Sequence, residues 1–240
     1  MRSLERALWI GLLLLGMVVA GPSRAGAAPI TFTASSGDLA ASAVFDISGT
    51  NLLVTLTNTS PFDVLVPTDV LTAVFFDITG DPALTSVSAT LASGSTVWFG
   101  SNGGGNVGGE WAYAHGLSGA PNGATQGISS TGLGLFGGPT FPGADLQRPL
   151  AVDGLQYGIT SAGDDPTTGN TAVTGTYALI HNSVVFVLGG LPGGFSLDDI
   201  SNVTFQYGTS PSEVPEPSTV ALLGLGLLMV AGRTARKRIR

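Results

Sequence analysis

The sequence predicts an all-β fold, and three observations indicate it. Glycine accounts for 36 of the 240 residues, and it costs about 1 kcal/mol per helical position relative to alanine. Apolar and polar residues alternate in several short runs, which is typical of strands with one buried face. Clusters rich in Gly, Asp, Asn and Pro separate these runs, as turns do. Together these features favour an antiparallel β-sandwich, jelly-roll or immunoglobulin-like.

The predicted strands fall into two groups. Strict alternation predicts half-buried strands at residues 30–35, 52–57, 86–91 and 202–207. Two runs, 70–78 and 184–188, are almost continuously apolar, so we expect strands that are buried on both faces. The intervening turns are predicted at 48–51, 80–82, 163–166 and 189–194.

The stretch from Gly100 to Gly143 has a different composition, because glycine recurs throughout it. We expect long loops with brief strands that extend from one end or edge of the sandwich. Loops of this length are commonly functional or mobile.

Charge and cysteine content exclude several classes of function. The chain contains no cysteine, which excludes disulfides, thiolate metal sites and cysteine nucleophiles. From Ala28 to Val214 there are 14 carboxylates and one cation, Arg148, a net charge of −13. Such a surface repels phosphate backbones, so we expect no nucleic-acid partner.

The N-terminus has the pattern of a secretory signal peptide. Arg2 and Arg6 precede an apolar run that ends at Ala20, and Ala25-Gly26-Ala27 follows. A charged start, a short apolar run and an A-x-A site predict a signal peptide at 1–27, cleaved by signal peptidase before Ala28. The alternative, a buried N-terminal helix, is disfavoured because the flanking charge and the cleavage motif agree.

The C-terminus combines an extended motif, an apolar run and a basic end. Val214-Pro215-Glu216-Pro217 closes a linker at 209–217, after an ectodomain at 28–208. We expect a short transmembrane sorting helix at 218–232 and a basic cytoplasmic tail at 233–240. The 13 apolar residues at 220–232 span about 20 Å, less than the roughly 30 Å hydrocarbon core of a bilayer. A marginal anchor beside a stiff Pro-Glu-Pro motif favours a processing signal.

This tail resembles the PEP-CTERM signal of Gram-negative bacteria, which has the same order of motif, short helix and basic terminus. The resemblance implies recognition by an exosortase, a membrane transpeptidase-like enzyme, in bacteria that make exopolysaccharide and biofilm. A single-pass anchor that is never cut is the alternative. The middle of the chain is similar to exosortase-dependent surface proteins of unassigned activity, in the phrases at 132–136, 153–159 and 203–209. That likeness implies no catalytic residues.

The residues that could carry chemistry are few. A glycosidase needs two carboxylates about 5–10 Å apart, and Glu110, flanked by aromatic residues, could pair with Asp145 or Asp153. His115 and His181 are the two histidines, and we expect ordinary loop or strand-end roles for both. We therefore predict that the protein is not an enzyme.

Two binding sites remain as hypotheses, each with a structural alternative. Trp98, Trp111 and Tyr113 could stack on pyranose faces, or these rings could close one end of the core. Asp164 and Asp165 could form a weak calcium site, or could make the local hydrogen bonds that Asp makes in turns. No other cofactor is expected.

The sequence as a whole predicts an exported cell-surface or biofilm-matrix protein without catalytic activity, held by a transient or retained membrane anchor. The alternative is a carbohydrate-binding module or glycoside hydrolase that acts on exopolysaccharide through the loops at 100–143. A cleft shared by Glu110, a second carboxylate and an exposed Trp111 would favour the alternative.

Overall fold

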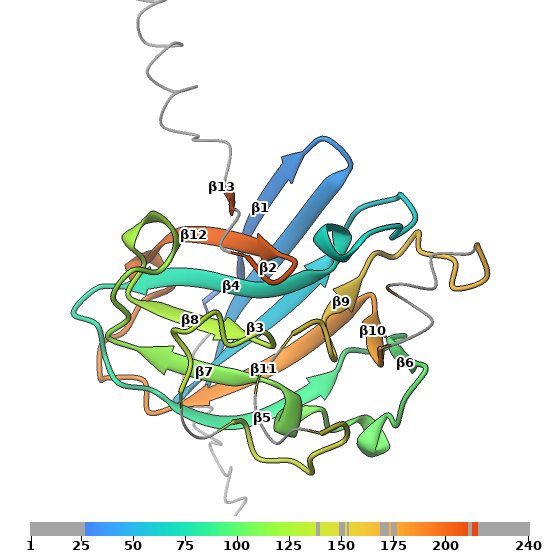
Figure 1. Ribbon diagram of the computed structural model, residues 1–240. Coiled ribbons are helices and arrows are strands. Elements are labelled where there is room, and N and C mark those ends of the chain that lie inside the picture. Colours follow the sequence, from blue (N-terminus) through green and yellow to red (C-terminus); the bar gives the residue numbers. More distant parts are fainter. Residues whose placement is uncertain are drawn as a thin grey trace, which may run out of the picture.

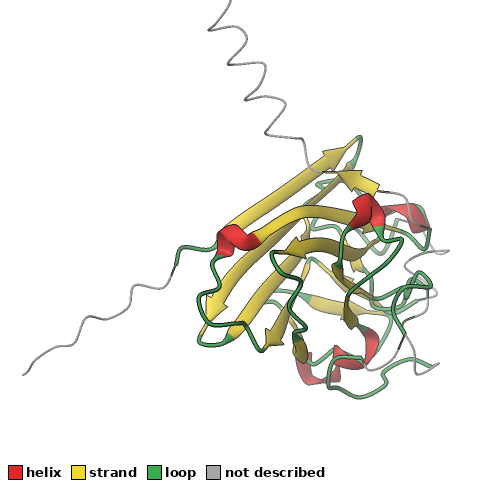
Figure 2. Cartoon of the chain, turned by 90° about the vertical axis from the view of Figure 1, so that its left-hand side faces the viewer, coloured by secondary structure: helices red, strands yellow, loops and turns green. Residues whose placement is uncertain are grey.

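The computed structural model describes residues 27–137, 140–148, 152, 154–168, 173, 177–210 and 213–215. Within these ranges the regular structure is strand, and helix is limited to 3-10 turns of three residues (Figure 2). None of the helices found there is long and apolar enough to cross a membrane. The signal helix, the sorting helix and the basic tail that the sequence predicts lie outside the described residues.

The strands form two sheets (Figure 1). Sheet A has the order β1-β2-β3-β11-β5, and all its neighbours are antiparallel. Sheet B has the order β13-β12-β4-β9-β10-β6, and β8 also pairs with β4 and carries β7. The strands of sheet A are β1 (Ile30–Ser36), β2 (Leu39–Ser48), β3 (Asn51–Asn58), β5 (Thr85–Leu91) and β11 (Ser183–Gly189).

Sheet B is built from shorter pieces. Its strands are β4 (Leu71–Ile78), β6 (Thr96–Trp98), β7 (Ala112–His115), β8 (Gln126–Ser129), β9 (Ile159–Thr160), β10 (Leu179–His181), β12 (Ile200–Tyr207) and β13 (Glu213–Pro215). The 3-10 turns are η1 (Pro67–Asp69), η2 (Gly103–Gly105), η3 (Gly108–Glu110), η4 (Pro121–Gly123) and η5 (Leu197–Asp199).

A core between the two sheets makes the architecture sandwich-like. Phe45 of β2 and Phe76 of β4 are fully buried, and their rings meet edge to face with centroids 5.3 Å apart. Such aromatic pairs contribute about 0.5–1.5 kcal/mol beyond the area they bury. One strand pair departs from the antiparallel prediction, because β9 and β10 run parallel. The long connection from Ser161 to Ala178 makes this possible, since parallel neighbours need a crossover.

Burial on both faces is confirmed for β4 and wrong for β11. Val74 and Phe76 enter the main core, and Ala73 and Phe75 join a second apolar cluster on the opposite face of sheet B. Val185 and Val187 of β11 are only half-buried. The outward residues of the neighbouring strands β3 and β5 are likewise partly exposed, so this face of sheet A meets solvent.

Two further departures from simple alternation occur in strands that carry register shifts. Val87, predicted to face the core, is 44% exposed, because the pairing of β5 with β11 shifts there and leaves Val87 without a register partner. In β12, Thr204 and Gln206 were predicted to face solvent and are buried instead. That strand lies between β4 and β13 and carries two register shifts of its own.

The glycine-rich stretch contains brief strands, as predicted, but it does not project from the sandwich. Its strand β8 pairs with β4, and β7 extends the sheet beyond β8. Val107, Trp111 and Ile128 from this stretch are fully buried in the main core. It is therefore an integral layer of the fold.

Candidate functional site

The C-terminal sorting segment begins inside the fold. Its backbone pairs antiparallel with β12, with Glu213 opposite Gln206, Val214 opposite Phe205 and Pro215 opposite Thr204. The predicted linker at 209–217 thus includes a strand. Glu216 and Pro217, the rest of the predicted motif, lie outside the described residues.

The predicted signal cleavage site lies at the edge of the folded region. Ala27 and Ala28 are exposed and precede β1, which begins at Ile30. Ala25 lies outside the described residues. The bond after Ala27 is therefore not enclosed by the sandwich.

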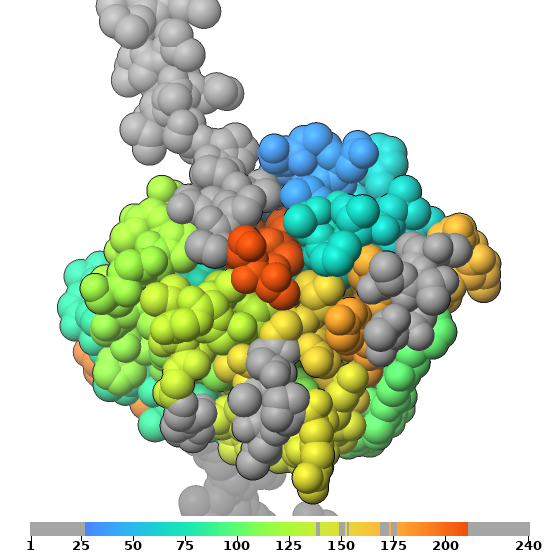
Figure 3. Space-filling model, viewed as in Figure 1, coloured from blue at the N-terminus to red at the C-terminus, as the bar shows by residue number. Residues whose placement is uncertain are grey.

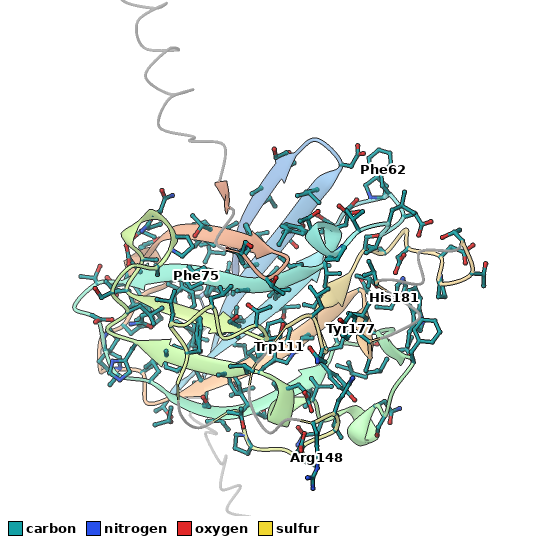
Figure 4. The ribbon with its side chains drawn as sticks, viewed as in Figure 1. Phe62, Phe75, Trp111, Arg148, Tyr177 and His181 are labelled. Carbon is teal, nitrogen blue, oxygen red and sulfur yellow. The ribbon has the colours of Figure 1, made fainter. Side chains whose placement is uncertain are left out.

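Trp111 cannot act as a surface platform for a sugar, because it is fully buried. Its ring packs on Phe186 of β11 with a centroid distance of 4.9 Å, and Phe141 packs on the same Phe186 at 5.4 Å. Figure 4 shows Trp111 in the middle of the molecule and Phe62 at its rim. For Trp111, the alternative that the rings close the core is correct.

Trp98 and Tyr113 belong to separate parts of sheet B. The Trp98 ring in β6 stacks on His181, with centroids 4.5 Å apart and an interplanar angle of 20°. Tyr113 lies in β7, which Figure 1 shows on the other side of the view from β6. The three predicted sugar-binding rings are therefore not brought together.

Tyr113 lies in a groove of about 570 Å³ beside β5. His115, two residues further along β7, is exposed, and its ring lies 6.5 Å from that of Tyr113 at an angle of 30°. Thr85, Ser86 and Thr140 also line the groove. None of the lining residues is Asp, Glu, Lys or Arg.

A partly buried hydrogen-bond network holds the Tyr113 ring. Its hydroxyl donates to Gln126 Oε1 at 2.9 Å, and Gln126 Nε2 donates to Asp81 Oδ1 at 3.0 Å. Gln126 is fully buried. Burial raises the pKa of Tyr113 well above its usual value, so the ring stays neutral and fixed at physiological pH. The network preorganises one wall of the groove.

Glu110 is buried and accepts backbone hydrogen bonds, and it does not lie in an open cleft. It is 4% exposed, and its Oε1 accepts hydrogen bonds from the backbone N–H groups of Leu146 at 2.7 Å and Gln147 at 3.1 Å. Asp145 is exposed, and Asp153 lies outside the described residues. The arrangement that would favour a glycosidase requires an exposed Trp111, and Trp111 is buried.

Carboxylates join the loop at 59–66 to the loop at 161–168. Asp164 Oδ1 accepts from Val64 N, and Asp63 Oδ1 accepts from Asp165 N, both at 3.0 Å. Burial and a hydrogen bond with Asp63 raise the pKa of Asp164 to about 6. Burial also raises the pKa of Asp63, but hydrogen bonds from Thr168, Asp164 and backbone N–H groups outweigh it, so this pKa lies below its usual value.

The calcium hypothesis gains no support from this geometry. Asp165 Oδ1 accepts hydrogen bonds from the backbone N–H and the hydroxyl of Thr167, which is the local turn bonding given as the alternative. Within the described ranges, no group of three or more His, Cys, Asp or Glu side chains is placed to hold a metal ion. A pocket of about 240 Å³ lies beside these loops, lined by Asp38, Asp63 and Asp69 and by the exposed Phe62 and Leu65.

The sequence did not predict that His115 and residues of β5 line one groove. The only local signal was Tyr113-x-His115, which places two rings on one face of a strand. The opposing wall comes from β5, about 30 residues earlier in the chain. The alternation of apolar and polar residues does not indicate which distant strands lie next to each other.

Comparison with known protein families agrees with the C-terminal motif. The family model described as the PEP-CTERM protein-sorting motif matches residues 213–238, so the predicted resemblance of the tail is confirmed. The motif implies recognition by an exosortase, export, and membrane-associated surface sorting in Gram-negative bacteria. Searches of curated proteins and of solved structures each gave no significant match.

Proposed function

We propose that this chain is an exosortase-sorted cell-surface or biofilm-matrix protein whose ectodomain acts without catalysis. The observation that carries the proposal is the sorting motif at 213–238, which begins in the last described strand of a sandwich-like β fold. The exposed Ala27 and Ala28 before β1 support cleavage by signal peptidase. A folded domain between two processing signals is the organisation expected of a displayed protein.

The non-catalytic role is supported by the position of Glu110, which both of the candidate glycosidase pairs require. Glu110 is buried and bonded to two backbone N–H groups, which leaves it poorly placed to meet a substrate. Its neighbour Trp111 is part of the core.

Expression of the full chain in a host with and without exosortase tests the proposal. We expect a mature N-terminus at Ala28 in both hosts, and loss of the C-terminal tail and arrival at the surface only with exosortase. Replacing Pro215, Glu216 and Pro217 by alanine should leave a full-length precursor in the inner membrane. A triple variant that reaches the surface at normal size contradicts the proposal, and a start upstream of Ala20 contradicts signal cleavage.

Carbohydrate binding is a second candidate, and the groove beside Tyr113 and His115 favours it. Aromatic ring faces stack on pyranoses, and rings that are already held in place bind with less loss of entropy. The groove lining carries no carboxylate although the surrounding ectodomain has a charge of −13, so a neutral polysaccharide suits it.

A glycan array on the mature secreted protein tests this second candidate. We expect weak binding of neutral oligosaccharides that His115→Ala reduces at least fivefold. The matched control is His181→Ala, which removes the other histidine, stacked on Trp98 away from the groove. Equal binding by both variants would place any sugar elsewhere.

A further inference from the structure

Strand β13 joins the sorting motif to the folded domain. It consists of Glu213, Val214 and Pro215, the first three residues of the matched motif, and it forms the outer edge of sheet B. It also lies next to β1, the first strand of the chain (Figure 1). The start of the motif is thus a structural element of the ectodomain.

Buried side chains fix the path by which the chain leaves β12. Gly208 has a φ of 69°, and its N–H donates to Val70 O at 2.8 Å. Thr72 Oγ1 donates to Gly208 O at 2.7 Å, and Gln206 Nε2 donates to Ser210 O. Thr72 and Gln206 are both fully buried. These bonds within the fold therefore direct the chain where it leaves β12. The end of β12 lies at the surface, between the β1–β2 hairpin and the glycine-rich stretch (Figure 3).

Pairing with β12 competes with capture of the motif by another protein. Extended segments are commonly bound by strand addition, in which the main-chain N–H and C=O groups of the segment bond to the receptor. In β13 the groups that face β12 are already used, and Pro215 has no N–H to donate. The pairing is also short, with only three residue pairs, so β13 can separate while the rest of sheet B stays intact.

We propose that docking of β13 on β12 is an autoinhibitory contact that withholds the sorting motif until the strand detaches. The inference depends on the proposed function, because it concerns the same exosortase-directed motif. The rate at which β13 detaches depends on its three residue pairs with β12, and this rate then limits how fast the tail is processed. When docked, β13 also covers the edge of β12, which would otherwise present unpaired backbone groups.

A disulfide across the pair tests the proposal, because the chain has no other cysteine. Gln206 and Glu213 are directly paired, and paired antiparallel residues have Cα atoms about 4.5–5.5 Å apart, within the range of a disulfide. In the full chain, with exosortase present, we expect the oxidised Gln206→Cys, Glu213→Cys variant to lose its tail at least fivefold more slowly than Gln206→Cys alone. A reductant should restore the rate.

The opposite change gives a second readout. Glu213→Pro removes a backbone N–H from β13 and leaves Val-Pro-Glu-Pro intact, so we expect at least twofold faster loss of the tail than in Glu213→Ala. Equal rates with and without a mass-verified disulfide overturn the autoinhibitory contact. Slower processing of both the disulfide and the proline variants also overturns it, because exosortase would then recognise the docked strand. A wild-type chain that keeps its tail in the exosortase host instead overturns the proposed function.

Discussion

The hairpin of β2 and β3 and the glycine-rich stretch at 100–143 both contribute to the buried core, by opposite means. In the hairpin, eight consecutive residue pairs alternate between core and surface, and Phe45, Leu52 and Val54 fill the space between the sheets. In the glycine-rich stretch, backbones approach closely where side chains are missing. A Cβ atom at Gly108 would lie 2.3 Å from Pro142 O, and one at Gly109 would lie 2.0 Å from Ala144 O.

The difference shows two ways to form a core. Large apolar side chains can fill the space between sheets, or glycines can let backbones pack directly against each other. The first kind leaves a period of two in the sequence, which can be recognised. The second kind leaves only a high glycine content, which is equally typical of a flexible loop. Each kind predicts a different response to substitution.

The largest expected effect is at Phe186, where the two kinds of packing meet. Its side chain lies in the regular sheet A and contacts Trp111 and Phe141 of the glycine-rich stretch. Phe186→Ala should lower the free energy of unfolding by about 3–5 kcal/mol, measured by denaturant unfolding of the mature protein.

The control for Phe186 is Val187→Ala, the half-buried neighbour on the other face of β11. It should cost less than about 1.5 kcal/mol. Similar losses for the two variants would mean that the glycine-rich stretch does not depend on sheet A for its packing.

A methyl group at Gly109 should have the next largest effect. The added Cβ would clash with the backbone oxygen of Ala144, so the chain must shift to remove the clash. We expect Gly109→Ala to lower the free energy of unfolding by about 2–3 kcal/mol. Gly137→Ala in the same stretch is the matched control, since a Cβ there meets nothing within 4 Å. It should change the free energy of unfolding by less than about 0.5 kcal/mol. Equal effects would show that the stretch behaves as a loop.

The same contrast explains which parts of the fold were predictable. Alternation found β1, β3 and most of β5, and continuous apolarity found β4, because side chains in those strands report their own burial. The layer formed by β7 and β8 was interpreted as loops with brief strands that project from the fold. Glycine has no side chain whose polarity could indicate that the segment is buried. Bulges at Val87 and within β12 were also hidden, since they depend on partner strands that are distant in sequence.

At the candidate sites, motifs read by other proteins were more predictable than geometry. The Val-Pro-Glu-Pro tail is recognisable because an enzyme must recognise it as a sequence. The burial of Trp111 and the separation of Trp98 from Tyr113 could not be found in this way, because they arise only when β6 and β7 take their places in sheet B.

Glu110 tests whether the glycine-rich stretch also depends on a specific polar bond. Its carboxylate accepts two backbone N–H groups, and Glu110→Gln keeps the shape but replaces charged acceptors by a neutral one. We expect a loss of about 1–2 kcal/mol in thermal or denaturant unfolding. The exposed Asp145→Asn is the control and should be nearly neutral. An unchanged stability for Glu110→Gln would mean that the packing of this stretch does not depend on the charge of Glu110.

The smallest expected effect is a dependence on pH that belongs to neither compared region. The pKa of Asp164 is raised to about 6 from an ordinary value of 3.8, so the folded state binds its proton more tightly than the unfolded state. The resulting stabilisation is complete below about pH 4 and is lost as the pH rises through 6. It should amount to about 1 kcal/mol, since water at the adjacent pocket weakens the effect.

The measurement is the melting temperature of wild type and Asp164→Asn at pH 5 and pH 7. Wild type should gain stability from this group at pH 5, and Asn, which keeps an acceptor for Val64 N but does not titrate, should flatten that part of the profile. Asp63→Asn should flatten it in part, because the hydrogen bond and the charge of Asp63 both raise the pKa of Asp164. Parallel profiles for wild type and Asp164→Asn would mean that the loops at 59–66 and 161–168 do not set the pH dependence.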